Sequence, residues 1–407
     1  MTPDIALTNS PTPGWYGANP FTDDLKADPH EVYRQLREQA PVNLTPDGRW
    51  RLTRYADIQK LLKNSKVGMR HLNGLIPDHS QEETDQSKFM LRQDPPDHDR
   101  LRQLVSKAFT PRALAAMRPQ VQKLVDAELD KVIPNGEMEL VEDLALLVPA
   151  ASMCSMLGIS FVDRKRLSTL VSQVTYLLAI QFFPELRETA NKALEELAIY
   201  MYELIEQRRV KPSDDILSAL VQAEEAGDKL STEELIQQSM GLLVAGLETT
   251  IGLIGNGMRC FARNPDQFER LAAHPELLES AVNECLRYEP SVPQTVRVLW
   301  EDTQFGDTVI PADSVVNAML IVANRDPAAF TDPDLFDIGR NEAKHCSFGG
   351  GIHFCLGSHL AKMNAEIAFA SIVKRIKNIK LDEAGFEWAP SLFRIPGKIP
   401  ASFQPRQ

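Results

Sequence analysis

The order of apolar and polar residues along the chain predicts a mainly helical protein with small β-sheets. Helical periodicity is expected at 28–38, 55–63, 94–109, 112–133, 137–158, 163–178, 184–209, 214–226, 231–263 and 275–288, with a last helix ending near Asn378. Strand-like patterns occur at 42–44 and 50–52, which Pro46-Asp47-Gly48 joins as a turn, and again at 295–300, 309–311 and 315–319. The pattern therefore favours a helix-rich fold.

The segment 231–263 predicts a long helix in the interior of the protein. Ser231 and Glu234 have the spacing of a capping box, which marks the start of a helix. The middle of the segment is apolar on nearly all sides, and such a helix has no side that faces solvent. We therefore expect this helix to be buried.

A polar stretch, Ala245-Gly246-Leu247-Glu248-Thr249-Thr250, interrupts the apolar middle of this helix. Burying a carboxylate and hydroxyls is costly, so their presence needs a reason. A threonine hydroxyl can bond the carbonyl four residues earlier and Gly246 weakens the turn, so we expect a local kink. Two interpretations remain: a helix defect solvated by an internal water, or an acid–alcohol pair that relays protons into a buried site.

A glycine-rich stretch near the C-terminus, Phe348-Gly349-Gly350-Gly351-Ile352-His353-Phe354-Cys355-Leu356-Gly357, holds one cysteine. Glycines let the backbone adopt positive φ angles and approach another group closely. A helix that begins just after Cys355 points its free N–H groups toward the sulfur, which favours a thiolate and therefore a metal. The alternative is a buried free cysteine beside a glycine turn.

Charged residues in other segments also suggest binding roles. His98 and Arg102 lie four residues apart, on one face of the helix that begins at Asp94-Pro95-Pro96. They either clamp an anion by charge-assisted hydrogen bonds or form an exposed basic face. Glu284 and Arg287 have the spacing of an ordinary surface pair on a helix, so this pair alone indicates little.

Composition and charge narrow the range of functions. The chain has 407 residues and a net charge of -12, which argues against a general nucleic-acid-binding protein. Its five cysteines are scattered, so neither a disulfide framework nor a zinc ribbon is indicated, and a reducing cytoplasm is expected. Residues 1–30 are expected to form an irregular arm without a signal peptide, and no apolar run reaches the length of a bilayer span. The sequence contains no nucleotide-binding glycine motif, so we expect no fused reductase domain in this chain.

The glycine–cysteine stretch fits F-x-x-G-x-x-x-C-x-G and resembles the haem-binding loop of the cytochrome P-450 superfamily, whose iron ligand is a cysteine thiolate. Three further motifs occur in the family's order: the His98/Arg102 helix, A-G-x-E-T at 245–249, and E-x-x-R at 284–287. The resemblance covers almost the whole length and is to the soluble bacterial type. It implies a single triangular, helix-rich domain over residues 1–407, with a long central helix.

The resemblance also implies a haem b cofactor, with O2 as co-substrate. Cys355 would be the axial ligand of the haem iron. Gly246 and Thr249, with Ala245, would form the oxygen groove, and Glu248 would help to deliver protons. The residues implied to bind haem are His98, Arg102, Arg297, Phe348, Gly349, His353, Cys355, Gly357 and Ala361. Glu284, Arg287 and Arg340 would form a buried network that supports folding of the haem side.

The implied activity is insertion of one atom of O2 into a C–H or C=C bond of a lipophilic small molecule, such as a terpenoid, steroid, fatty acid or polyketide. Electrons would come from a ferredoxin and a ferredoxin reductase, and a basic patch around Arg112, Lys344 and Lys362 would receive the acidic donor. The enzyme would be a cytoplasmic monomer. The residues expected to line the substrate pocket are Phe182, Leu242, Leu243, Leu247, Val292, Thr295, Leu392 and Phe393.

Three alternatives remain open on the sequence. The first is a related haem-thiolate enzyme driven by peroxide, against which the Glu248–Thr249 pair argues. The second is a non-catalytic haem sensor or carrier. The third is a helical protein with a structural cysteine loop and no cofactor.

Overall fold

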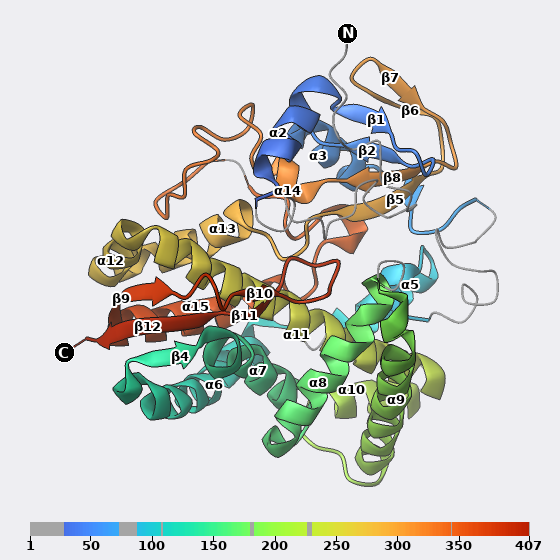
Figure 1. The fold of residues 1–407 in the computed structure, drawn as a ribbon. Coiled ribbons are helices and arrows are strands. Elements are labelled where there is room, and N and C mark those ends of the chain that lie inside the picture. Colours follow the sequence, from blue (N-terminus) through green and yellow to red (C-terminus); the bar gives the residue numbers. More distant parts are fainter. Residues whose placement is uncertain are drawn as a thin grey trace. The chain divides into compact units, whose positions relative to one another are not determined.

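The computed structural model describes residues 28–72, 88–106, 109–179, 183–225, 230–342 and 344–406. The chain divides into two compact units, and Figure 1 shows the elements of each. The first unit comprises Met1–Gln86, Val292–Pro333 and Glu342–Phe354, and the second comprises Ser87–Ser291, Asp334–Asn341 and Cys355–Gln407. The single domain implied by the resemblance stays a prediction.

A five-stranded sheet organises the first unit, with the strand order β1-β2-β8-β5-β3. Its strands are β1 (Val42–Leu44), β2 (Trp50–Leu52), β3 (Val67–Gly68), β5 (Thr295–Leu299) and β8 (Val315–Ala318). The expected hairpin forms, because β1 and β2 pair antiparallel with Val42 opposite Leu52. Strand β2 also pairs parallel with β8, and β5 pairs antiparallel with β8 so that Arg297 lies opposite Val316.

The core of the first unit lies between this sheet and a short helix. The helices of the unit are α2 (His30–Gln39), α3 (Tyr55–Lys63) and α14 (Leu320–Ala323), and its small hairpin is β6 (Thr303–Phe305) with β7 (Thr308–Ile310). Ile58 and Leu61 of α3 are fully buried and pack in one cluster with Leu52 of β2 and Phe305. Burying such side chains contributes about 1.5–3 kcal/mol each. Cys346 belongs to the same cluster, so it is a core residue.

Helices dominate the second unit. They are α5 (Asp97–Ser106), α6 (Pro111–Val132), α7 (Leu147–Leu157), α8 (Arg164–Thr175), α9 (Arg187–Val210), α10 (Ile216–Glu225), α11 (Thr232–Arg263), α12 (Pro265–Ala273), α13 (Leu278–Tyr288) and α15 (Ser358–Arg375). The unit also holds a three-stranded sheet in the order β4-β12-β9 and the pair β10-β11. These strands are β4 (Glu137–Glu139), β9 (Ile376–Leu381), β10 (Glu387–Trp388), β11 (Pro396–Lys398) and β12 (Pro400–Pro405).

The long helix α11 lies at the centre of this helical unit, where it contacts α7, α8, α9, α13 and α15 (Figure 1). The expected capping box is present, because the Ser231 hydroxyl accepts from the Glu234 N–H and the Glu234 carboxylate accepts from the Ser231 N–H. Phe261 near its C-terminal end packs edge-on against Phe268, Phe336 and Phe369. The burial predicted for this helix is therefore confirmed.

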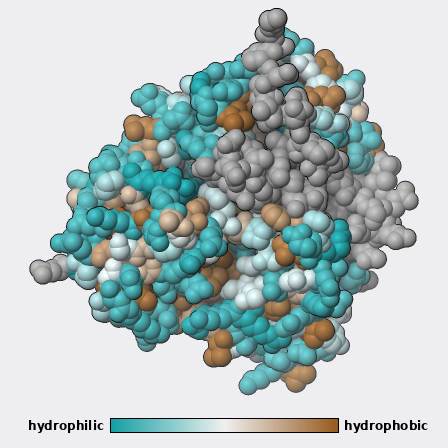
Figure 2. Space-filling view, viewed as in Figure 1, coloured by the Kyte–Doolittle hydropathy of each residue, from teal (hydrophilic) through white to brown (hydrophobic). Residues whose placement is uncertain are grey.

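By length and composition alone α11 could cross a membrane, since its most apolar part has a mean hydropathy of 1.2. Two thirds of that part, 67%, is buried inside the protein, as in the core helix of a soluble protein. It is the one such helix in the described part of the chain. On the face drawn in Figure 2 most visible residues are hydrophilic, and hydrophobic ones are scattered.

The structure corrects several boundaries expected from the sequence. The segment 137–158 is not one helix: it begins with β4, continues as a π-helix over Val141–Ala145, and only then forms α7. Helix α11 is continuous from Thr232 to Arg263, and the kink expected within it stays a prediction. The last helix ends at Arg375 rather than near 378 because the chain there enters β9. Helix α12 was not expected, although Asn264-Pro265 is a recognisable start signal.

Candidate active site

The polar stretch of α11 holds an acid and an alcohol in different environments. The Thr249 hydroxyl donates to the Ala245 carbonyl oxygen four residues earlier, at 2.6 Å, as expected for a threonine inside a helix. The Glu248 side chain is buried and accepts a hydrogen bond from the Ser172 hydroxyl of α8, at 2.5 Å. Burial raises the pKa of Glu248, and the hydrogen bond from Ser172 only partly opposes this.

The residues of this polar stretch are buried to different degrees. Ala245 is exposed and Gly246 and Thr249 are half-buried, whereas Leu247 and Glu248 are buried. An added Cβ at position 246 would lie 2.6 Å from the sulfur of the flexible Met153 side chain on α7. A larger residue at this position would therefore require Met153 to shift.

The glycine stretch adopts the backbone geometry that its composition predicts. Gly349 and Gly351 have φ angles of 67° and 65°, a region that favours glycine. At Gly351 an added Cβ would also lie 2.2 Å from the Leu62 carbonyl oxygen, which cannot move like a side chain. A short 3-10 helix over Gly351–His353 follows, and the Phe354 N–H donates to the Gly351 carbonyl. The rings of Phe348 and Phe354 face each other edge-on.

Cys355 lies three residues before the start of α15. The Gly357 N–H donates to the Cys355 sulfur, and the Arg102 guanidinium of α5 is close enough to attract it. Burial raises the pKa of the Cys355 thiol, while Gly357 and Arg102 both stabilise the thiolate. Burial lowers the pKa of Arg102, and the negative charge on Cys355 opposes this shift. The second unit thus places a backbone donor and a cation at one sulfur.

The predicted anion-binding residues are divided between the two units. His98 and Arg102 lie on α5 in the second unit, and the fully buried His98 ring has its Nδ1 2.9 Å from Asp99 Oδ1. Arg297 and His353 belong to the first unit. The buried Arg297 guanidinium donates to the Val296 carbonyl at 2.7 Å and to the Thr295 hydroxyl at 3.2 Å. Their joint role as anion ligands stays a prediction.

The predicted network of one acid and two arginines is formed inside the second unit. The Arg287 guanidinium donates twice to Glu284, at 2.7 and 2.8 Å, and the Arg340 Nε lies 3.3 Å from the same carboxylate. Both guanidinium groups also donate to the Leu335 carbonyl, and the Asp337 N–H donates to Glu284. Each of these hydrogen bonds has a charged donor or a charged acceptor. A buried ion pair needs such hydrogen bonds to offset the loss of solvation.

The residues expected to line a pocket have different exposures. Leu242, Leu243, Leu247 and Leu392 are buried, and Phe393, Val292 and Thr295 are half-buried. Phe182 lies outside the described residues.

Ser172 and Met153 were missed, because nothing in the sequence says which residues of α8 and α7 reach α11. Ala361 lies half-buried in the first turn of α15, and an added Cβ at Gly357 would meet nothing within 4 Å.

Comparison with known proteins decides the family. A family model described as Cytochrome P450 matches residues 10–383. The chain belongs to the cytochrome P450 family. Among its relatives, a "Cytochrome P450" of Bacillus subtilis (strain 168) is 37% identical over 392 residues, covering 93% of this chain and 95% of the relative. The Vitamin D(3) 25-hydroxylase of Pseudonocardia autotrophica is 34% identical, covering 95% and 96%.

Solved structures agree with this assignment. The crystal structure of the myxobacterial cytochrome P450 CYP267B1 in complex with myristic acid superposes with a TM-score of 0.85 at 38% identity, covering 95% of this chain and 98% of that one. The predicted fold class, mainly helical with small sheets, is confirmed. The chain is a P450 monooxygenase, and its relatives are bacterial proteins whose substrates differ. Membership in the family implies a haem-thiolate centre and redox partners.

Proposed function

We propose that this cytochrome P450 binds haem b through Cys355 and oxygenates a lipophilic small molecule with electrons from a ferredoxin. The observation that carries the proposal is the environment of Cys355, where the Gly357 N–H donates to the sulfur and Arg102 attracts it. Both interactions favour the thiolate, which is the form that ligates a metal. Among the described residues no cluster of other metal-ligating side chains competes with this sulfur.

The residues around Cys355 fit a haem. A porphyrin carries two carboxylates, and Arg102 offers a cation while His98 offers a buried imidazole on the same helix. The Gly357 N–H at the start of α15 approaches the sulfur and would tune its donation to a bound iron. When bound, the haem-thiolate group supplies the activation of O2 and the insertion of one oxygen atom.

The residues of α11 supply the proton chemistry. Thr249 and Glu248 belong to consecutive positions, and the raised pKa of Glu248 lets its carboxyl hold a proton closer to neutral pH than an ordinary glutamate does. Thr249 is half-buried beside the exposed Ala245, so its hydroxyl is within reach of a small molecule. This pair favours O2 with external electrons over a reaction driven by peroxide.

Substrate class and electron donor follow from the apolar side chains and from the relatives. Leu242, Leu243 and Leu247 are buried and Phe393 is half-buried in the second unit, and all four are apolar, which suits a lipophilic ligand. One relative is named as a vitamin D(3) hydroxylase and another was solved in complex with myristic acid, and both compounds are lipophilic. For the donor, Arg112 is exposed at the start of α6 and Lys362 is half-buried on α15, and both are suited to a weak encounter with an acidic ferredoxin.

Turnover with isotopically labelled oxygen tests the proposal. The enzyme is supplied with ferredoxin, ferredoxin reductase and NAD(P)H, together with a library of steroids, fatty acids, terpenoids and polyketides. We expect a product that carries one atom from ¹⁸O2, and a spin-state shift of the haem by the same compound. Haem-loaded, reducible protein that oxygenates no lipophilic compound would contradict the substrate class, and a product formed only with peroxide would contradict the donor.

A further inference from the structure

The hydroxyl of Ser172 departs from the behaviour of its neighbours on α8. A serine or threonine inside a helix commonly bonds the carbonyl four residues back in its own helix. Ser168 does so to the Arg164 carbonyl at 2.7 Å, and Thr169 does so to the Lys165 carbonyl at 3.0 Å. Ser172, one turn further on, instead donates across to the carboxylate of Glu248 on α11 at 2.5 Å.

The hydrogen-bond partner of Glu248 is a neutral hydroxyl group. Among the described residues no Lys, Arg or His pairs with this buried carboxyl. The titratable group that interacts with it is Tyr176, just beyond the end of α8, whose own pKa is raised by burial and by the charge of Glu248. From α7, the apolar side chain of Met153 lies against Gly246 of this stretch. A cation would fix Glu248 in the ionised state, whereas a hydroxyl holds the carboxyl in place and leaves it able to gain and lose a proton.

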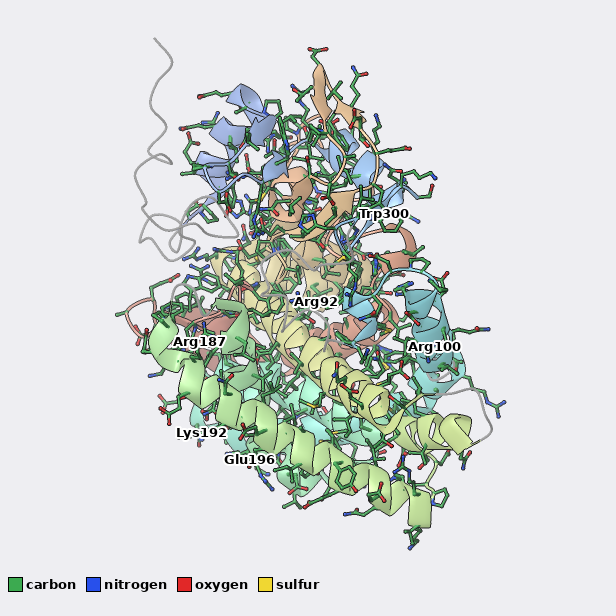
Figure 3. The ribbon with its side chains drawn as sticks, turned by 90° about the vertical axis from the view of Figure 1, so that its right-hand side faces the viewer. Arg92, Arg100, Arg187, Lys192, Glu196 and Trp300 are labelled. Carbon is green, nitrogen blue, oxygen red and sulfur yellow. The ribbon has the colours of Figure 1, made fainter. Side chains whose placement is uncertain are left out.

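Helix α8, which carries Ser172, packs against both α9 and α11. Arg166 forms an ion pair with Glu196 of α9 at 2.7 Å, and the Tyr200 hydroxyl of α9 donates to Asp163 at 3.1 Å. Figure 3 shows Glu196 on α9, on the same run of helix as Arg187 and Lys192. Helix α9 packs along α8, and Ser172 lies on the part of α8 that reaches α11.

We propose that Ser172 is a positioning residue for the monooxygenase reaction, which holds the carboxyl of Glu248 so that the acid–alcohol pair of α11 can deliver protons. The inference rests on the proposed function, because it gives Glu248 and Thr249 their role in that reaction. It adds a third residue from a different helix. Ser172 acts through Glu248 and is not itself a catalytic residue.

The test compares Ser172→Ala and Ser172→Thr with Ser168→Ala, which removes a buried hydroxyl from the same helix without touching Glu248. All are made in the haem-loaded enzyme. We expect Ser172→Ala to lose about ten-fold in product formed per electron pair, as for one lost hydrogen bond to a charged group, and to release peroxide instead. Since Ser172 stabilises the carboxylate, its loss raises the pKa of Glu248 further, and the fall in coupling with rising pH moves to higher pH. Ser172→Thr and Ser168→Ala should resemble the wild type.

A second measurement does not depend on turnover. The protonated carboxyl of Glu248 has an infrared C=O band, which Glu248→Gln identifies by its loss, and its pH titration in the resting protein should move upward in Ser172→Ala alone. An unchanged titration and unchanged coupling in a folded Ser172→Ala would overturn the inference. Equal losses in Ser168→Ala would also overturn it, because they would indicate a structural role. A wild-type protein without a thiolate-type spectrum with carbon monoxide would refute the proposed function itself, which separates the two failures.

Discussion

The buried network around Glu284 makes the sharpest prediction about stability. Replacing Arg287 by Met keeps most of the side-chain volume and removes two hydrogen bonds to Glu284 and one to the Leu335 carbonyl. Both partners are almost completely buried, with side-chain exposures of 2% and 1%. Removing one partner of a buried pair costs about 3–5 kcal/mol, because the other charge is left in a poorly solvating environment. Glu284 keeps the Asp337 N–H and Arg340, so we expect a value near the lower end, about 3 kcal/mol.

The assay is denaturant unfolding followed by circular dichroism, with Arg263→Met as the matched control. Arg263 pairs with Glu383 in the same unit at 3.0 Å, but their side chains are 49% and 52% exposed. An exposed pair contributes at most about 1 kcal/mol. Equal losses of unfolding free energy in the two variants would refute the argument that burial determines the strength of these pairs. A loss of haem content in Arg287→Met without a loss of stability would also contradict the structural role of the network.

Three further predictions concern the site. Thr249→Ala should keep O2 consumption but release most of the reducing equivalents as peroxide, and unchanged coupling would refute the relay role of Thr249. Gly351→Ala should destabilise the folded protein by at least about 1–2 kcal/mol, because Gly351 has a positive φ and the new Cβ would lie 2.2 Å from the Leu62 carbonyl oxygen. As a control, Gly357→Ala places its Cβ where no atom lies within 4 Å, so it should change the stability by less than about 0.5 kcal/mol in either direction. Because burial raises the pKa of Glu248 above the ordinary value of 4.5, the folded state binds more protons than the unfolded state. Thermal stability should therefore fall as pH rises from 4.5 through the raised pKa. The fall should be absent in Glu248→Gln, and equal pH profiles would show that Glu248 does not titrate in this way.

Local chemistry accounts for the parts of the fold that the sequence predicts well. The capping box at Ser231, the turn at Gly48 and the hydrogen bond from Thr249 to Ala245 each depend on residues within four positions of one another. The positive φ at Gly351 is of the same kind. In these cases the short-range stereochemistry of the side chain or of glycine selects one conformation.

Contacts between residues far apart in the sequence explain the predictions that were wrong and the residues that were missed. The stretch after Gly136 has the composition of a helix, yet Met138 pairs with Ala401 of β12, so tertiary context overrides local propensity. The π-helix that follows keeps the Leu146 N–H on the Val141 carbonyl, five residues earlier. Ser172 could not be found for the same reason, since its partner Glu248 is 76 positions away. The motifs predict which residues carry chemistry, and packing between helices decides which residues support them.

The account depends most on Cys355 as the ligand of the haem iron. The direct measurement is the absorption spectrum of the reduced protein with carbon monoxide, recorded for the wild type and for Cys355→His. We expect the wild type to give the red-shifted band of a thiolate-ligated haem, and Cys355→His to bind haem without that band. A wild-type spectrum that lacks the band, or a Cys355→His variant that keeps it, would contradict the claim.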